Sequence, residues 1–356
     1  MEGLQNILYE SMGDKQLKDY IITYLNTTDV DPDVLEKIKS LLDRSGLDNN
    51  MVEDFFRRKG LDDCYEFILS IFSEYGDIES ISNHIKNPIN ISSSDLVKHN
   101  NIYKLLTPYV KQKTLDKLTN YRPAKNNIAR GPYEIILDIF LNDITDKNTG
   151  VADVNTTGIG GIELKGPNAR IKGSLKPAPY NCTITFNNIM SQRGIDLKVD
   201  SLFQNSGFIK SIISKLKDEF GLEESDICSI LAKCMLSKYA NKSANTKDIE
   251  DEMVAILMDN SKELFNNKKT APAIFYAFLV ADMYFYQASE NWDYIMIFKG
   301  RKLQQSNGNY IMIGKDDVKK GLKSIYNIFQ KNGVYTNSSS VHDNDSFCQA
   351  CTIFVK

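Results

Sequence analysis

The feature that most constrains the fold of this chain is a change in the sequence pattern after Gly131. Upstream, apolar residues recur at helical spacing, whereas after Gly131 a short helix-like segment precedes two brief apolar segments rich in glycine. These two segments, near residues 151–154 and 159–165, are predicted to be strands joined by turn residues ending at Gly158. Short strands in a helical background predict a mixed α/β (α+β) fold.

Residues 1 to about 120 are predicted to form a helical domain. Val34, Leu35, Ile38, Leu41 and Leu42 fall on one face of a helix, and Asp31-Pro32-Asp33 supplies a capping side chain and a proline for its first turn. The periodicity breaks between Thr119 and Arg130, which is the predicted boundary. We expect these helices to position the rest of the chain and to contribute no catalytic group.

Residues 125–356 are predicted to form a second domain, with a helical insertion at about 207–288. After the insertion, segments 293–298 and 310–313 have the pattern of a hairpin, 316–330 that of a helix and 352–355 that of a last strand. Residues 182–186 are a further candidate strand, because β-branched and apolar side chains follow one another there.

Charge and composition exclude several classes of protein. The 356 residues carry 43 Lys and Arg against 46 Asp and Glu, so any contact with nucleic acid must come from a local patch and not from bulk charge. No apolar run reaches the ~18–20 residues of a membrane span, so we expect no membrane association. Six cysteines are too few for a disulfide scaffold and indicate a reducing compartment such as the cytoplasm.

The candidate catalytic residues lie in and beside the two strand segments. Asp153 ends the first strand, and the period of two places Glu163 and Lys165 on one side of the second strand, with Leu164 facing the core. Two such carboxylates can hold Mg²⁺, which polarises a phosphodiester and lowers the pKa of a bound water. Lys165 can orient that water or neutralise charge on the phosphate. Glu134, on the preceding helix, would add an outer carboxylate.

In this order, a helix Glu134, then Asp153, then Glu163-Leu164-Lys165, the chain resembles the PD-(D/E)xK (restriction-endonuclease-like) nuclease superfamily. The resemblance extends from Gly131 to Gly173, and Ala152 stands where that family places a proline. It implies an αβββαβ core, with Glu134, Asp153, Glu163 and Lys165 as catalytic residues and the three carboxylates as metal ligands.

The resemblance also implies an activity. It points to Mg²⁺-dependent hydrolysis of DNA, endonucleolytic in mode, with Mn²⁺ able to substitute for Mg²⁺. The segment from Glu163 to Gly173 is similar to phage-encoded members, so we expect a protein of a phage, mobile or defence element. It would act in the host cytoplasm or be associated with a virion, as a homo-oligomer or within a larger complex.

A local basic run follows the second strand. Asn168, Arg170 and Lys172 are predicted to bind nucleic acid, since Lys and Arg side chains next to a cleavage site supply contacts to phosphates. For Lys176, a solvated loop explains the charge equally well.

A second interpretation of the same residues stays open. Asp153 can cap a turn, and Glu163 and Lys165 can form an ion pair on a solvated strand face. The chain would then be a structural or interaction protein of a virion or complex, with an inactive nuclease-like core. The glycines at 158, 160, 161 and 166 favour the nuclease, because a backbone that approaches phosphate closely requires residues without side chains.

A pair of cysteines near the C-terminus raises the question of zinc. Cys348 and Cys351 form a CxxC with His342 upstream, and only Cys228 and Cys234, at odd spacing, could complete four ligands. Two ordinary thiols are therefore favoured over a zinc site.

Overall fold

The computed structural model of the chain falls into two compact units. It describes residues 30–62, 64–119, 131–145, 152–167, 169, 171, 179–203, 206–239, 246–265, 270–289, 292–300, 307–336 and 353–355. By their contacts, unit 1 comprises residues 1–160 with 307–309, and unit 2 comprises residues 161–306 with 310–356.

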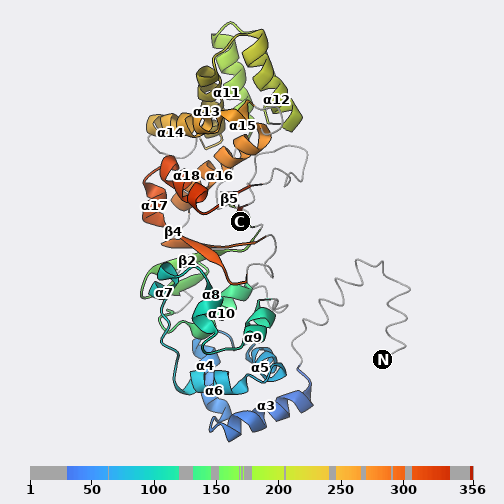
Figure 1. The fold of residues 1–356 in the computed structure, drawn as a ribbon, viewed down its shortest axis with the longest axis vertical. Helices are drawn as coiled ribbons and strands as arrows, with labels where there is room; N and C mark the ends of the chain where they lie inside the picture. The colour runs from blue at the N-terminus through green and yellow to red at the C-terminus, as the bar shows by residue number, and fades with distance from the viewer. Residues whose placement is uncertain are drawn as a thin grey trace, which may run out of the picture. The chain divides into compact units, whose positions relative to one another are not determined.

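Unit 1 is built mainly of helices (Figure 1). They are α3 (Pro32–Arg44), α4 (Asn49–Arg58), α5 (Tyr65–Glu74), α6 (Ile78–Lys86), α7 (Ser93–Lys98), α8 (Ile102–Leu106), α9 (Gln112–Leu118) and α10 (Pro132–Phe140), followed by strand β1 (Val154–Thr156). The predicted helical character is confirmed for the described residues of this region. A strand is present where the first one was predicted, but it runs over residues 154–156 and not 151–154.

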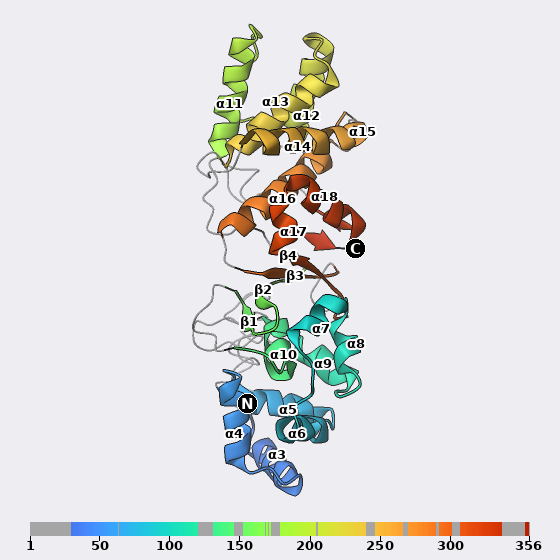
Figure 2. The same ribbon diagram turned by 90° about the vertical axis from the view of Figure 1, so that its left-hand side faces the viewer.

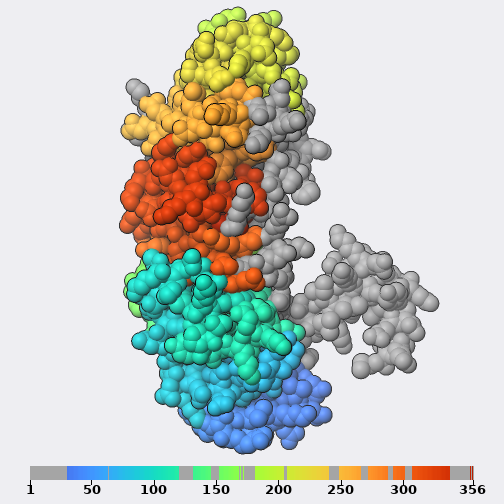
Figure 3. Space-filling view, in the orientation of Figure 1, coloured from blue at the N-terminus to red at the C-terminus, as the bar shows by residue number. Residues whose placement is uncertain are grey.

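The start of α3 follows directly from its sequence. The Asp31 carboxylate accepts a hydrogen bond from the Asp33 N–H at 2.9 Å, and Pro32 occupies the first turn, where no N–H is needed. Ile38 and Leu42, four residues apart, are buried. Helix α3 packs against α5 and α6. In Figure 3 the dark blue atoms of the first described residues adjoin the lighter blue atoms that follow them in the chain.

Helix α10 lies at the centre of unit 1. Six of its apolar side chains are almost completely buried: Tyr133, Ile135, Ile136, Leu137, Ile139 and Phe140. It contacts α9, which precedes the predicted domain boundary, and β1, which follows it. Residues 120–130 lie outside the described part of the chain, and a division near residue 120 stays a prediction.

Unit 2 contains a small sheet and a large set of helices (Figure 2). Its elements are strand β2 (Gly160–Lys165), helices α11 (Pro179–Gln192), α12 (Ser206–Ser214), the π-helical turn η2 (Lys215–Glu219), α13 (Glu224–Ser237), α14 (Thr246–Asp259), α15 (Ser261–Leu264) and α16 (Thr270–Ser289), strands β3 (Tyr294–Phe298) and β4 (Tyr310–Gly314), helices α17 (Lys315–Lys319) and α18 (Leu322–Lys331), and strands β5 (Val334–Tyr335) and β6 (Phe354–Val355). The predicted helices at 207–288 are confirmed.

The sheet of unit 2 is mixed, with the strand order β2-β3-β4. Strand β2 pairs in parallel with β3, so that Glu163 lies opposite Ile295 and Lys165 opposite Ile297. Helices α11 to α16 form the long crossover that a parallel pair requires. Strand β3 then pairs antiparallel with β4, which confirms the predicted hairpin.

The candidate strand at residues 182–186 is wrong, because these residues lie within helix α11. Cys182, Phe186 and Met190, each four residues from the next, are buried, whereas Ile184 is 51% exposed. This is the pattern of one helix face, and α11 packs on α13. Packing at helical spacing therefore overrides the local β-propensity of the segment.

Candidate active site

Strand β2 places Glu163 and Lys165 on the same face, as the period of two predicts. The Lys165 ammonium group donates a hydrogen bond to Oε1 of Glu163. Glu163 is only 9% exposed, and the Lys165 side chain is also largely covered. Leu164, predicted to face the core, is half-buried. The face that carries the charges is therefore enclosed by protein, which a solvated strand face would not be.

A third residue of unit 2, Tyr286 on α16, completes this cluster. Its hydroxyl donates a 2.7 Å hydrogen bond to Oε1 of Glu163, and the Lys165 ammonium nitrogen lies 5.2 Å from the centre of the Tyr286 ring. The ring also neighbours that of Trp292, with 6.1 Å between the ring centres. Sequence reasoning missed Tyr286, which is 123 residues from Glu163. The sequence offers one signal for it: the phenol of Tyr286 follows the carboxylate of Asp282 by four residues in a largely apolar helix.

The two donors converge on one oxygen of Glu163. Both Lys165 and Tyr286 bond to Oε1, and Oε2 accepts no hydrogen bond from the residues that the structure describes. A carboxylate held in this way keeps the lone pairs of its second oxygen for a cation or a water.

The other two predicted carboxylates belong to unit 1. Glu134 lies in the first turn of α10, where its Oε2 accepts a hydrogen bond from the Gly131 N–H at 3.1 Å. There it caps the start of its own helix and complements the helix dipole. Asp153 is half-buried and directly precedes β1, which starts at Val154, so the prediction that it ends the first strand is wrong.

Within the described ranges, no group of three or more His, Cys, Asp or Glu side chains is close enough together to hold a metal ion. The set of Glu134, Asp153 and Glu163 as metal ligands therefore stays a prediction from the sequence pattern. The chemistry of the donors fits Mg²⁺, because this ion commonly uses one or two carboxylates and keeps several waters.

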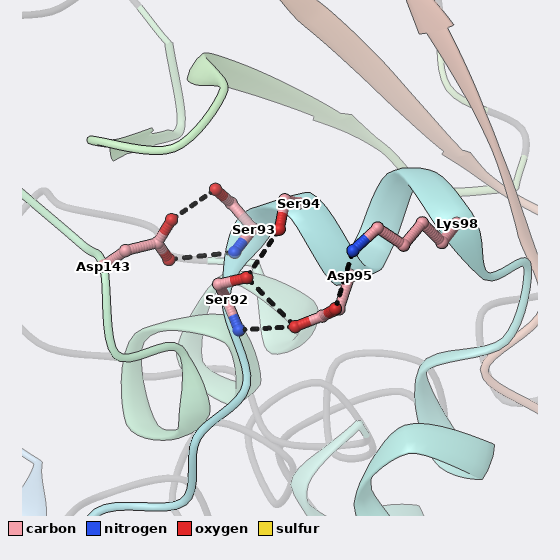
Figure 4. Close-up of polar contacts among 6 residues, drawn as sticks. All are labelled: Ser92, Ser93, Ser94, Asp95, Lys98 and Asp143. Carbon is pink, nitrogen blue, oxygen red and sulfur yellow. Dashed lines mark hydrogen bonds and ion pairs between the residues drawn. The ribbon is translucent and has the colours of Figure 1, made fainter.

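A contact within the protein accounts for the glycine at position 158, and the sequence alone does not reveal it. Asp143 accepts hydrogen bonds from the Ser93 N–H, at 2.9 Å, and from the Ser93 hydroxyl, at the start of α7 (Figure 4). A Cβ atom on Gly158 would lie 2.6 Å from Oδ2 of Asp143 and 2.7 Å from Oγ of Ser93. The absence of a side chain at Gly158 thus leaves room for this hydrogen-bonded pair.

The conformation of Gly160 gives a reason for a glycine within the protein, whereas Gly161 makes a backbone contact that other residue types could also make. Gly160 has a φ of +85°, a conformation that side chains disfavour. The Gly161 N–H donates to Oδ2 of Asp293 at 2.9 Å, and Asp293 also pairs with Lys315 at the start of α17. Burial alone would raise the pKa of Asp293, but the bonds from Lys315 and Gly161 hold it below its ordinary value. Gly158 and Gly160 are therefore no independent evidence for bound phosphate.

The predicted nucleic-acid contacts Asn168, Arg170 and Lys172 lie outside the described residues. Of their neighbours, Ile171 is buried and the Ala169 carbonyl accepts a hydrogen bond from the Ile353 N–H at 3.0 Å. These two positions tie the segment after β2 to unit 2.

The candidate zinc ligands Cys348, Cys351 and His342 also lie outside the described residues. Cys228 and Cys234 are buried in α13 as free thiols, and burial raises the pKa of Cys228 to about 12. A thiol that stays protonated is a poor zinc ligand, since zinc binds the thiolate.

Comparisons of the chain with protein-family models, with curated protein sequences and with solved structures find no match. Among the described helices, none combines the length and the apolar character needed to cross a membrane. The function is therefore inferred from the residues of this chain alone.

Proposed function

We propose that the chain is a Mg²⁺-dependent DNA nuclease with a PD-(D/E)xK site, cutting DNA endonucleolytically in a phage, mobile or defence element. The observation that carries the proposal is the Glu163–Lys165 pair on one face of β2. Its carboxylate is fixed through Oε1, and Oε2 accepts no hydrogen bond within the described chain.

The order of the elements supports the same proposal. Helix α10, strand β1 and strand β2 follow one another, and a helical connection then leads to β3, which pairs in parallel with β2. This agrees with the start and the end of an αβββαβ core. Its remaining strand has no counterpart among the described elements between β2 and α11, where residues 172–178 lie outside the described chain.

The roles of the residues follow from their chemistry. Glu163, through Oε2, and Asp153 would bind the ion, with Glu134 as an outer carboxylate. Bound Mg²⁺ supplies a Lewis acid and lowers the pKa of a coordinated water. Lys165 presents an ammonium group beside that carboxylate, where it can neutralise charge on a phosphate.

One observation favours the alternative, an interaction protein with an inactive nuclease-like core. Glu163 is buried and hydrogen-bonded by both Lys165 and Tyr286, an arrangement that a purely structural ion pair would also have. Removing one partner of such a pair destabilises the fold, typically by about 3–5 kcal/mol.

The two functions are separated by a plasmid-nicking assay with the full chain, in Mg²⁺ and in EDTA. For the nuclease, Glu163→Gln and Asp153→Asn should abolish Mg²⁺-dependent nicking while the thermal unfolding transition persists, and Lys165→Met should slow it. Lys315→Met is the matched control, because Lys315 also pairs with a carboxylate in unit 2 but has no proposed part in the reaction. Absence of nicking by the wild-type chain, or full activity of Asp153→Asn, contradicts the proposal.

The proposed DNA-binding residues have their own measurement. Replacing Arg170 and Lys172 together by Ala should weaken DNA binding equally for unrelated sequences. The slope of log affinity against log salt should become shallower by roughly one unit for each phosphate that the protein no longer neutralises. An unchanged slope would show that these side chains do not bind the DNA backbone.

A further inference from the structure

Helix α16 carries two buried, hydrogen-bonded polar side chains on one face. Asp282 is 5% exposed and Tyr286 4% exposed, and their spacing of four residues aligns them along the helix. Most of the remaining side chains of α16 are apolar and buried. The two polar groups therefore fix which way this helix faces.

Asp282 anchors α16 to the end of α13. Its Oδ1 accepts a 2.8 Å hydrogen bond from the Lys238 ammonium group and a second bond from the Tyr239 hydroxyl. The Tyr239 ring stacks on that of Phe285, with 4.1 Å between the ring centres. The turn of α16 that carries Tyr286 is thus held in place next to its anchor.

From this arrangement we infer that Tyr286 is a positioning residue for Glu163. The Tyr286 hydroxyl and the Lys165 ammonium group together hold Oε1, which would leave Oε2 to bind a divalent cation. This inference rests on the proposed function, because it assigns Glu163 to the metal. It adds a residue that supports Glu163 from a helix more than 100 positions further along the chain.

The ring of Tyr286 and its hydroxyl have separable roles. A phenylalanine would keep the contact with the Trp292 ring and remove the bond from the hydroxyl to Glu163. Without that bond, Lys165 alone would hold Oε1, and the carboxylate would be free to rotate. Tyr276, on the same helix, provides a matched comparison, since its buried hydroxyl has no hydrogen-bond partner among the described residues.

The chain contains a natural reporter for this test. Trp292 is its only tryptophan, it is buried, and it lies beside Tyr286. Mn²⁺ is paramagnetic and quenches a nearby indole, so a Mn²⁺ titration of the fluorescence of the full chain measures binding at Glu163 without any cleavage. Mg²⁺ should reverse the quenching by competition, and Glu163→Gln should abolish it.

Tyr286→Phe should raise the Mn²⁺ concentration at half-maximal quenching by about 10- to 100-fold, the usual effect of removing a partner of a metal ligand. Tyr276→Phe should leave it unchanged. An unshifted midpoint in Tyr286→Phe, an equal shift in both variants, or no saturable quenching in the wild-type chain would overturn the inference. Quenching that depends on Tyr286 in a chain that does not nick DNA would support the positioning role and refute the nuclease.

Discussion

His84 illustrates how burial settles the protonation state of a single side chain. Its Nδ1 accepts a hydrogen bond from the Ile89 N–H at 2.9 Å, so its ring proton is on Nε2, which donates to the Ile139 carbonyl at 2.8 Å. Burial lowers its pKa, and the nearby Lys59 ammonium group lowers it further, although the bond to Ile139 opposes them. Only the neutral ring can make both bonds, because one ring nitrogen must accept a hydrogen bond while the other donates one.

We therefore predict that His84 makes stability depend on pH. Below about pH 6.5 the unfolded chain binds a proton at His84 that the folded chain does not, so stability falls as the pH falls, by at most about 1.4 kcal/mol per pH unit from this residue. This loss of stability ends once the pH is below the lowered pKa of His84 in the folded chain. Urea unfolding between pH 5 and 8 measures it. His84→Gln should flatten the dependence, and the same change at exposed His99 should not.

Gly158→Ala is predicted to destabilise unit 1 by roughly 1–3 kcal/mol, because its Cβ would collide with Asp143 and Ser93 and break their hydrogen bonds. Thermal or urea unfolding measures the change. Gly131→Ala is the control, since no atom lies within 4 Å of its added Cβ. Equal stability of the two variants would show that the turn at Gly158 adapts without cost.

At the scale of residues, the sequence predicted what depends on local spacing. The period of two was sufficient to place Glu163 and Lys165 on one face. It could not reveal Tyr286, because a contact between residues so far apart in the chain leaves no local pattern. The contacts of Gly158 were hidden for the same reason, since the side chains of Asp143 and Ser93 next to it belong to more distant segments.

At the scale of elements, periodicity predicted most helices and the β3–β4 hairpin, whose apolar patterns repeat over many residues. It failed at α11, where a run of threonine and isoleucine resembles a strand. The buried spacing of Cys182, Phe186 and Met190 shows that a partner helix, α13, decides this element. Such patterns cannot predict the strand order, because the parallel pairing of β2 with β3 joins segments separated by all of α11 to α16.

The ion pair that joins α13 to α16 gives a prediction at this scale. The side chains of Lys238 and Asp282 are 1% and 6% exposed, so Asp282→Ala should leave a buried ammonium group without its main partner and cost about 3–5 kcal/mol. Replacing both by Met and Leu should cost much less, since no charge stays buried. The control is Asp259→Ala, whose pair with Lys323 is 39% and 47% exposed and is worth about 1 kcal/mol or less. Urea unfolding of the variants compares these values.

At the scale of the whole molecule, the mixed fold class was predictable from the alternation of helical and strand patterns. The grouping of the elements was not. Residues 307–309 belong to unit 1, where the Gly308 carbonyl accepts a hydrogen bond from the Ile102 N–H at 2.8 Å and Asn309 accepts one from Asn101 at 2.7 Å. These bonds depend on residues some 200 positions apart, a separation at which no sequence period operates.

The packing of α10 predicts how the chain responds to truncation. Ile136, Leu137 and Phe140 line a small cavity together with side chains of α7 and α8, and Phe140 also packs against His84. A chain that starts at residue 122 lacks these partners and exposes about four large apolar side chains. The lost burial costs roughly 6–12 kcal/mol of folding free energy, which is comparable to the stability of a whole domain. It should therefore aggregate or lose its cooperative melting transition in circular dichroism.

A chain that starts at residue 30 is the control for this truncation, because it keeps every described contact of unit 1, and it should melt like the full chain. The opposite result is equally informative. If the chain from residue 122 is soluble, melts cooperatively and nicks DNA with Mg²⁺, then α10 does not require α7 to α9, and the division near residue 120 predicted from the sequence is the correct one.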